Sequence, residues 1–570
     1  QIGMTLVVGQ PAEEEILSLS EQSRGRFLIA ATDQQYVEAM RHALREAGVY
    51  GRSVVIRHAE DWTLPQLPGN WANAVILMAP ATEGLINAAM HQARPDGGIV
   101  RIVNSQADWP GFTRVRNTST LQWTRPPLTG AGEWSHLYGK PDNSSFGGEQ
   151  LAGVSTTDDL EVHWIGRPGP RYQADRSGRK PSPISRGGQL FLQGLNRIVA
   201  VDAFNGSIQW SLEVPGLERF NMPRDCSNWC VDDNALFAVV GSECWKIDTG
   251  SGTVLQRIPA NEYRDDPMDW GFVATHQNRL YGTAVRPGSS WTSFWGKADE
   301  GWYDARSGAV THPICSDRVF CRDAETGNLV WEYQSGVVLN PTLTISGDTM
   351  YFVESRSQKV LESDERRVGD PDLWKHLVLV AVDAATGSPK WEQKIPPMES
   401  QVIFYLAHAA GQLTLVSSSD KEYTVRSLTD TDGSERWSQK TAWPGGKGDH
   451  GKAMMRPAFL GDRILLRPDV LSLADGRILP EKMPDGHGCG TYACTADAVF
   501  YRASTLTMWT PETKEKSTWS RLRPDCWLSS IPAGGMLLSP EGGGGCSCGS
   551  WLETSIGFLP KTLIQPTAIP

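Results

Sequence analysis

The sequence contains no apolar segment long enough to cross a membrane as a helix. Such a helix needs about 20 consecutive apolar residues, whereas the longest apolar runs, such as 74–78, have the length of a strand. Positive charge is not in excess either, because 54 Lys and Arg stand against 65 Asp and Glu, with a net charge of −11 and both signs interspersed. Nucleic-acid binding needs a basic surface, so the composition excludes that class of partner.

Short catalytic motifs are absent as well. The chain has no G-x-S-x-G nucleophile motif, no H-E-x-x-H zinc motif, no phosphate-binding loop and no pair of carboxylates at an interpretable spacing. Catalytic residues therefore stay unknown at this stage. Trp and Gly are by contrast numerous, with 22 and 57 copies, and many of them belong to a repeated pattern.

The repeated pattern is an Asp, a Gly four residues later and a Trp four residues after the Gly. The Asp can accept hydrogen bonds from backbone N–H groups two or three residues on, and the Gly supplies a positive φ for a tight turn. An even offset in the strand that follows directs the Trp at a neighbouring sheet. The residues that carry the pattern are Asp202, Gly206, Trp210, Asp323, Gly327, Trp331, Asp383, Gly387, Trp391, Gly433 and Trp437, the last two in a copy taken to begin at Asp430.

The spacing of the repeat predicts a β-propeller. Turn glycines stand at 206, 252, 327, 387, 433 and 476, so the intervals are 46, 75, 60, 46 and 43 residues. A period of roughly 40–45 residues with four short strands per unit is typical of a propeller. Scattered hairpins in a sandwich explain neither the motif nor the period. The two long intervals predict insertions at about 284–318 and 355–377, and we expect eight blades, with seven as the alternative.

Residues 1–103 alternate strands and helices, which predicts an α/β, Rossmann-like domain with a parallel sheet covered by helices. The predicted strands are 4–9, 26–33, 52–58, 72–78 and 97–103, and the predicted helices are 11–22, 34–47 and 82–92. No sixth or seventh strand is evident after residue 103.

This first domain resembles the front part of the class I S-adenosylmethionine-dependent methyltransferases. The resemblance places Gly9 in the cofactor loop, Asp33 on the ribose and Asp61 near the adenine, and "ARPDGGIVRIV" is similar to the turn before the family's fifth strand. The loop has one Gly where the family has three, and Pro11 removes a backbone donor. We expect a domain that no longer methylates and that serves packing or association.

The Asp–Gly–Trp repeats resemble the PQQ-like quinoprotein repeat family over nearly 400 residues. "GEWSHLYGKPDN", residues 132–143, is similar to the lead-in ahead of such propellers, and "LEVHWIG", 160–166, to the outer strand that joins the last blade. The order of segments resembles large exported bacterial proteins, notably of planctomycetes. We therefore assign 104–159 to a linker and lead-in, 160–562 to the propeller and 563–570 to a tail.

The resemblance raises quinoprotein chemistry, in which PQQ is polarised by Ca²⁺ and covered by a disulfide between adjacent cysteines. This chain has no adjacent cysteine pair and no C-x-x-C-H haem site. The repeat alone binds no cofactor, because each of its residues serves a turn or a contact between blades. No cofactor is assigned, and PQQ, Ca²⁺ and S-adenosylmethionine remain alternatives.

A cysteine and histidine group near the C-terminus is the sharpest local signal for a site. Disulfides, a metal site and free buried thiols all fit Gly-flanked Cys and His residues. A local disulfide between Cys226 and Cys230 and one between Cys315 and Cys321 are further expectations. The candidate metal ligands are His450, His487, Cys489, Cys546 and Cys548, and the disulfide alternative draws on Cys489, Cys494, Cys526, Cys546 and Cys548.

Ten cysteines favour an oxidising compartment, and we expect an exported, periplasmic or cell-surface protein. The chain begins at Gln1, so a signal peptide is neither visible nor excluded. The leading hypothesis is a non-enzymatic scaffold that binds a protein partner or assembles with itself through propeller loops. The alternatives are a PQQ- or metal-dependent oxidoreductase and an S-adenosylmethionine-dependent methyltransferase.

Overall fold

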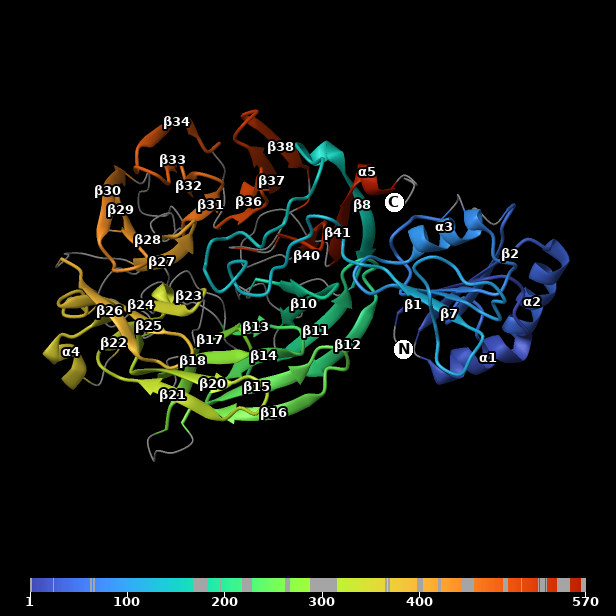
Figure 1. The fold of residues 1–570 in the computed structure, drawn as a ribbon, viewed down its shortest axis with the longest axis horizontal. Helices are drawn as coiled ribbons and strands as arrows, with labels where there is room; N and C mark the ends of the chain where they lie inside the picture. The colour runs from blue at the N-terminus through green and yellow to red at the C-terminus, as the bar shows by residue number, and fades with distance from the viewer. Residues whose placement is uncertain are drawn as a thin grey trace.

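The chain folds into an α/β domain followed by a β-propeller, shown side by side in Figure 1. In the parts of the chain that the structure describes, no helix is both long and apolar enough to cross a membrane. This structure is a computed structural model, and it describes residues 3–23, 25–61, 64, 67–167, 182–194, 196–217, 228–261, 267–287, 315–363, 366, 370–396, 403–418, 422–442, 456–484, 491–503, 505–520, 522, 528, 530–540 and 554–564.

The α/β domain contains a seven-stranded sheet in the order β3-β2-β1-β4-β5-β7-β6. The first five strands are parallel, and β7 pairs antiparallel with both β5 and β6. Its strands are β1 (Met4–Val8), β2 (Arg26–Ala31), β3 (Val54–His58), β4 (Ala74–Leu77), β5 (Ile99–Ile102), β6 (Thr113–Arg114) and β7 (Leu121–Thr124). Its helices are α1 (Glu13–Gln22), α2 (Gln34–Glu46) and α3 (Glu83–Gln92).

Each face of this sheet is covered by helices, as the alternating pattern predicts. Ile16 of α1 and Val37 of α2 pack on one face, and Leu85 and Ala89 of α3 pack on the other. The expectation that the sheet ends at the fifth strand is wrong. Two short strands, β6 and β7, extend it inside the segment that we had assigned to a linker, and they are too short and too polar to give a periodic signal.

The propeller has eight blades, so the first of the two predicted counts is confirmed. Blade 1 is β9 (Ile184–Arg186), β10 (Gln189–Gly194), β11 (Arg197–Asp202) and β12 (Ile208–Glu213). Blade 2 is β13 (Trp229–Val231), β14 (Ala235–Val240), β15 (Glu243–Asp248) and β16 (Val254–Pro259). Blade 3 is β17 (Asp269–His276), β18 (Arg279–Val285), β20 (Arg318–Asp323) and β21 (Leu329–Tyr333). Blade 4 is β19 (Cys315–Ser316), β22 (Val337–Leu339), β23 (Thr344–Ser346), β24 (Thr349–Ser355), β25 (Leu377–Asp383) and β26 (Pro389–Lys394), with η2 (Asn340–Thr342) and α4 (Gln358–Glu362).

The second half of the ring repeats the four-stranded plan and ends by using a strand from before blade 1. Blade 5 is β27 (Ile403–Ala409), β28 (Gln412–Ser418), β29 (Glu422–Thr429) and β30 (Glu435–Ala442). Blade 6 is β31 (Ala458–Leu460), β32 (Arg463–Leu466), β33 (Asp469–Ser472) and β34 (Ile478–Lys482). Blade 7 is β35 (Ala493–Cys494), β36 (Val499–Ala503), β37 (Thr505–Thr510) and β38 (Glu515–Trp519). Blade 8 is β39 (Ile531–Ala533), β40 (Met536–Pro540), β41 (Ser555–Pro560) and β8 (Leu160–Gly166), which follows η1 (Thr157–Asp159), and α5 (Lys561–Ile564) comes last.

The predicted role of residues 160–166 as the outer strand of the last blade is confirmed, because β8 pairs antiparallel with β41. Strands from the two ends of the propeller therefore close one sheet, which ties the ring together.

Tryptophan joins each of several blades to the next. The Trp391 Nε1–H donates to the Asp430 carbonyl oxygen in blade 5 at 3.2 Å. Gly433 in the same turn has φ +72°, and a Cβ there would lie 2.5 Å from the Trp391 ring. In blade 2 Gln256 stands at the Trp position and donates to the Thr326 carbonyl at 3.0 Å. The equivalent Trp donations run from Trp164 to Ala203, Trp210 to Thr249, Trp331 to Ala384 and Trp437 to Leu473.

The turn of blade 5 begins one residue earlier than we predicted. The Thr429 N–H donates to the Ser434 carbonyl, as the Asp383 N–H does to Ser388. Asp432 then accepts from the Ser434 N–H, while Asp430 pairs with a histidine at 3.1 Å. Asp430 is therefore not the first residue of this copy, because Thr429 occupies that place.

The cysteines that the structure describes are free and buried: Cys230, Cys244, Cys315, Cys321 and Cys494. The predicted bond between Cys315 and Cys321 is wrong, because the two lie in blades 4 and 3 and pack into separate cores. Cys494 likewise takes part in no disulfide, and burial raises the pKa of its thiol well above the usual value. Cys230 is free, and its predicted partner Cys226 lies outside the described residues.

Each blade presents its two kinds of connection at opposite ends. The Asp turns and the hairpins between first and second strands lie at one end, which we call the turn face; it includes 323–327 and 277–278. The opposite end, which we call the loop face, includes Arg286 and Gln334, where β18 and β21 end. Both predicted insertions join strand ends at the loop face, and the second contains α4.

The α/β domain lies beside the ring (Figure 1), and its contacts with blade 1 are at the turn face, at Asp202 and Asn205. Asp202 is fully buried and lies between Asn73 and Arg94 of the α/β domain: the Asn73 Nδ2–H donates to Asp202 Oδ2 at 2.7 Å, and Arg94 Nε lies 3.0 Å from the same oxygen. Asn205 donates to the Trp71 carbonyl at 2.8 Å. Polar contacts of this burial fix the orientation of one domain on the other.

Candidate functional site

The axis of the propeller contains a segment of the chain itself, residues 132–149, which we call the axial segment (Figure 1). It makes one circuit around the inside of the ring at the turn face and contacts the blades in order. Its hydrogen bonds run to Ser185 in blade 1, Val231 in blade 2, Thr275 in blade 3, Ile345 in blade 4, His408 in blade 5, Phe459 in blade 6, Cys494 in blade 7 and Gly535 in blade 8. The segment expected to be a lead-in is therefore the part of the chain that connects all eight blades.

Glu149 closes this circuit. Its carboxylate accepts from the N–H groups of Gly132 at 2.9 Å, Leu151 at 2.9 Å and Gly535 at 2.8 Å, so it joins both ends of the axial segment to blade 8. The side chain is fully buried, and burial raises the pKa of its carboxyl. Because its two carboxylate oxygens accept three backbone hydrogen bonds, Glu149 stabilises the fold rather than binding a ligand.

His136 is the most strongly perturbed histidine of the axis. The Thr275 backbone N–H donates to its Nε2 at 3.1 Å, and a backbone N–H can only donate, so the ring proton is on Nδ1 and faces Ser135 Oγ at 2.8 Å. Burial lowers the pKa of His136 to about 3. The ring is therefore a neutral structural link between the axial segment and blade 3.

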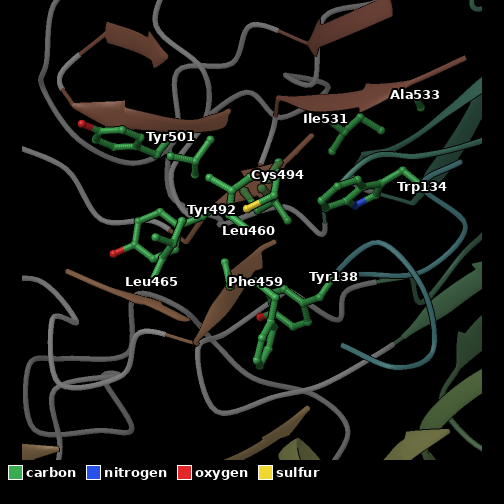
Figure 2. Close-up of a cluster of buried hydrophobic side chains, with 14 of the residues drawn as sticks. Trp134, Tyr138, Phe459, Leu460, Leu465, Tyr492, Cys494, Tyr501, Ile531 and Ala533 are labelled. Carbon is green, nitrogen blue, oxygen red and sulfur yellow. The ribbon is translucent and has the colours of Figure 1, made fainter. Parts of the chain in front are cut away.

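Arg456 is a fully buried guanidinium beside the axial segment. Its Cζ lies 4.2 Å from the Tyr138 ring centroid and 4.3 Å from the Tyr405 centroid, and its Nη2–H donates to the Pro341 carbonyl at 2.9 Å. Two aromatic faces stabilise the positive charge. Figure 2 shows Tyr138 of the axial segment close to Phe459, with Trp134 among core side chains of blades 6 to 8.

The predicted metal ligands His450, His487, Cys489, Cys546 and Cys548 lie outside the described residues, as does Cys526. Within the described ranges, no group of three or more His, Cys, Asp or Glu residues could hold a metal ion. The axial acid Asp142 accepts from the Ser144 N–H at 3.0 Å, and Glu149 is committed as above. The described donor set therefore does not fit the Ca²⁺ that a PQQ site would need.

The residues proposed for S-adenosylmethionine lie at the carboxyl edge of the α/β sheet, after β1, β2 and β3. Asp33 is the N-cap of α2 and accepts from the Gln35 and Tyr36 N–H groups at 2.8 and 3.1 Å. Gly9 has φ +134°, and a Cβ there would lie 2.9 Å from the Ala79 nitrogen. A glycine at this position therefore allows the loop after β1 to lie close to the end of β4. Asp61 is exposed beside a small pocket that Leu28 and Ala30 also line.

The loop that would receive the cofactor is tied to α2. The Tyr36 hydroxyl donates to the Pro11 carbonyl at 2.6 Å, and the Ala12 N–H donates to Glu15 Oε2 at 3.0 Å. Burial raises the pKa of Tyr36 to about 12, so the hydroxyl keeps its proton. These residues hold their own loop together and link it to α2.

Part of the propeller matches a known family, and solved structures of low sequence identity are similar to the chain. Residues 375–479 match a family model described as outer membrane protein assembly factor BamB. The quinohemoprotein alcohol dehydrogenase ADHIIG from Pseudomonas putida HK5 is similar in structure, with a TM-score of 0.47 and 12% identity over 75% of this chain and 80% of that chain. BamB from Moraxella catarrhalis is similar with a TM-score of 0.35 and 14% identity over 64% and 90%. No curated protein sequence matches the chain.

The α/β domain is similar to methyltransferases. A putative sarcosine dimethylglycine methyltransferase from Galdieria sulphuraria matches with a TM-score of 0.17 and 9% identity, over 18% of this chain and 39% of that chain. The chain thus has a PQQ-like eight-bladed propeller preceded by a Rossmann-like, methyltransferase-like α/β domain. A propeller fold does not by itself specify a role.

Proposed function

We propose that the protein is a non-enzymatic, exported scaffold that binds a protein partner, or a second copy of itself, through the loop face of its propeller. The axial segment carries this proposal. It bonds to all eight blades at the turn face, so the ring is a rigid support. Rigid supports of this kind present long connections for binding, and the strands that flank the predicted insertions 284–318 and 355–377 end and begin at the loop face.

Two further observations support a role in binding. The α/β domain contacts the opposite, turn face, so it leaves the loop face uncovered by the described part of that domain. Asp33, one of the positions where the methyltransferase resemblance implies a cofactor contact, accepts backbone N–H groups at the start of α2. Export is proposed from the match of 375–479 to a family named for assembly of outer membrane proteins.

The alternatives are oxidoreductase and methyltransferase activity, and reconstitution tests both. The full chain is incubated with PQQ and Ca²⁺ and assayed for dye reduction with alcohols and sugars, and it is titrated calorimetrically with S-adenosylmethionine. We expect no dye reduction and no heat at millimolar cofactor. Turnover with PQQ and Ca²⁺, or saturable heat with S-adenosylmethionine, would overturn the scaffold proposal.

A further inference from the structure

The propeller ring closes where two distant parts of the chain meet. β8 precedes blade 1 in the sequence, yet it pairs with β41 near the end of the chain. Trp164 of β8 also donates its Nε1–H to the Ala203 carbonyl, in the Asp turn of blade 1, at 2.7 Å. Figure 1 shows β8, β41 and α5 on the side of the ring that faces the α/β domain. We call this junction, formed by β8, β41 and the turn 202–206, the seam.

The α/β domain contacts the blade 1 side of the seam through one short segment, residues 70–73. The Asn73 Nδ2–H donates to Asp202 Oδ2 at 2.7 Å, and the Trp71 carbonyl accepts from the Asn205 Nδ2–H at 2.8 Å. Asp202 and Asn205 both belong to the turn that Trp164 of β8 contacts. The turn is therefore held by blade 8 and by the α/β domain together.

The same segment also reaches the blade 8 side of the seam. The Asn70 Nδ2–H donates to the Leu563 carbonyl at 2.9 Å, and Leu563 belongs to α5, which directly follows β41. Asn70 is buried, and its backbone N–H donates to the His91 carbonyl in α3 at 2.8 Å, which fixes this residue to the α/β domain. Residues 70–73 thus join the first blade to the end of the last blade.

The turn at the seam differs from the turns of blades 3 and 4 at its fourth residue. In those blades this residue is Thr326 or Thr386, which is exposed and donates its hydroxyl to the Asp of its own turn, at 3.0 and 2.9 Å. In blade 1 it is Asn205, which is buried and donates to the Trp71 carbonyl and, at 2.9 Å, to Asn73 Oδ1. The side chain that bonds within the turn elsewhere therefore bonds to the α/β domain here.

The first residue of the turn shows the same difference. The Asp202 side chain is fully buried, whereas those of Asp323 and Asp383 are each 28% exposed. We propose that the α/β domain is a clamp that holds the propeller ring closed at the seam. Buried hydrogen bonds on both sides of a junction resist its opening, because each bond that breaks leaves a polar group without a partner. This role does not depend on the scaffold proposal, since it concerns how the ring stays closed and not what its loop face binds.

Hydrogen exchange of the full chain, followed by mass spectrometry, tests the clamp in the variant Asn205→Thr. Asn205 Oδ1 accepts from the Ser207 N–H at 3.0 Å, and in blade 3 Thr326 Oγ1 accepts from the Asn328 N–H at 3.3 Å. The variant therefore keeps the bond inside the turn and loses the two donations to the α/β domain. We expect the exchange of the β8 and β41 amides to rise about tenfold, the effect of these lost hydrogen bonds on local opening. Exchange in blade 5 should stay unchanged.

Two further variants complete the test. Thr326→Asn makes the reciprocal change in blade 3, where this residue is exposed, and should leave exchange at the seam unchanged. Asn70→Gly removes the donation to Leu563 and tolerates the φ of +66° at this position, so it should also raise exchange in β41. With folding intact by circular dichroism, unchanged exchange of β8 and β41 in both Asn205→Thr and Asn70→Gly would overturn the proposal. An equal rise in all eight blades would overturn it as well.

Discussion

Arg94 of the α/β domain and Asp202 of blade 1 form a buried ion pair, with Nε and Oδ2 3.0 Å apart. The Arg94 Nε–H is not directed at the carboxylate, so the contact is electrostatic, while the hydrogen bond to Asp202 Oδ2 comes from Asn73. The same aspartate also receives the Phe204 N–H at 2.9 Å, as other turn aspartates receive theirs. One residue of the repeat thus serves both its own turn and the domain interface.

Asp202→Asn should loosen the α/β domain from the propeller. Loss of one partner of a buried pair costs about 3–5 kcal/mol, because the other charge stays buried. Differential scanning calorimetry should show the α/β domain unfolding in a separate, earlier transition. Asp383→Asn is the control. Because the Asp383 side chain is 28% exposed, this substitution should lower the free energy of unfolding by about 1 kcal/mol or less. An unchanged calorimetric trace for Asp202→Asn would contradict this account of the interface.

Gly433→Ala should destabilise the propeller more than a left-handed backbone alone explains. The new Cβ would lie 2.5 Å from the Trp391 ring, and overpacking adds about 1–3 kcal/mol to a conformational cost of about 1–2 kcal/mol. Gly411→Ala provides the comparison, because its φ of +71° is nearly the same and its nearest neighbour is 4.0 Å away. Urea unfolding followed by Trp fluorescence measures both, and equal shifts in midpoint would argue against a Trp contact at this turn.

Stability should depend on pH through His136. Because burial lowers its pKa from the ordinary 6.5 to about 3 in the folded state, the unfolded chain binds more protons between these values. The stability that the neutral His136 ring contributes to the folded state is therefore fully present above about pH 6.5 and is lost as the pH falls toward 3. We expect His136→Gln to flatten the slope of the thermal midpoint against pH between 6.5 and 4. An identical slope in the variant would mean that other groups control the transition.

Arg456→Lys should be destabilising although it keeps the charge. A lysine ammonium cannot stack between two rings as a guanidinium does, so about 2 kcal/mol should be lost at this buried site. Arg257→Lys is the matched control, because Arg257 lies 4.1 Å from the Trp245 ring centroid but is 55% exposed, and it should lose less than about 1 kcal/mol. Comparable losses measured by urea unfolding would indicate that the Tyr138 and Tyr405 faces do not hold the arginine.

The repeat was predictable from the sequence because the residues that specify each turn lie close together in the chain. An Asp, a Gly and a Trp within nine residues specify a turn and a contact with the next blade, and the intervals then give the ring. The predicted start of the turn was wrong only in blade 5. There Thr429 occupies the position of the aspartate, and the neighbouring Asp430 was taken for it. Trp164 follows the same rule, and its contact with Ala203 could have been found by reading the outer strand 160–166 as the last copy.

The axial segment and Arg456 could not be predicted in this way. Arg456 contacts Tyr138, Tyr405 and Pro341, which are far apart in the chain and carry no common motif. The contacts of the axial segment are mostly backbone hydrogen bonds, which leave little trace in side-chain identity. Strands β6 and β7 were missed for a related reason, since two to four residues are too few to show a period.

Site-specific crosslinking tests the scaffold proposal most directly. Benzoylphenylalanine is placed at Gln334 on the loop face and at Glu325 on the turn face, two exposed positions at opposite ends of the outer strand of blade 3. In cells that express the protein, we expect Gln334 to give one discrete adduct, with a partner protein or a second copy, and Glu325 to give none. Equal adducts at both positions, or none at Gln334, would contradict a binding role for the loop face.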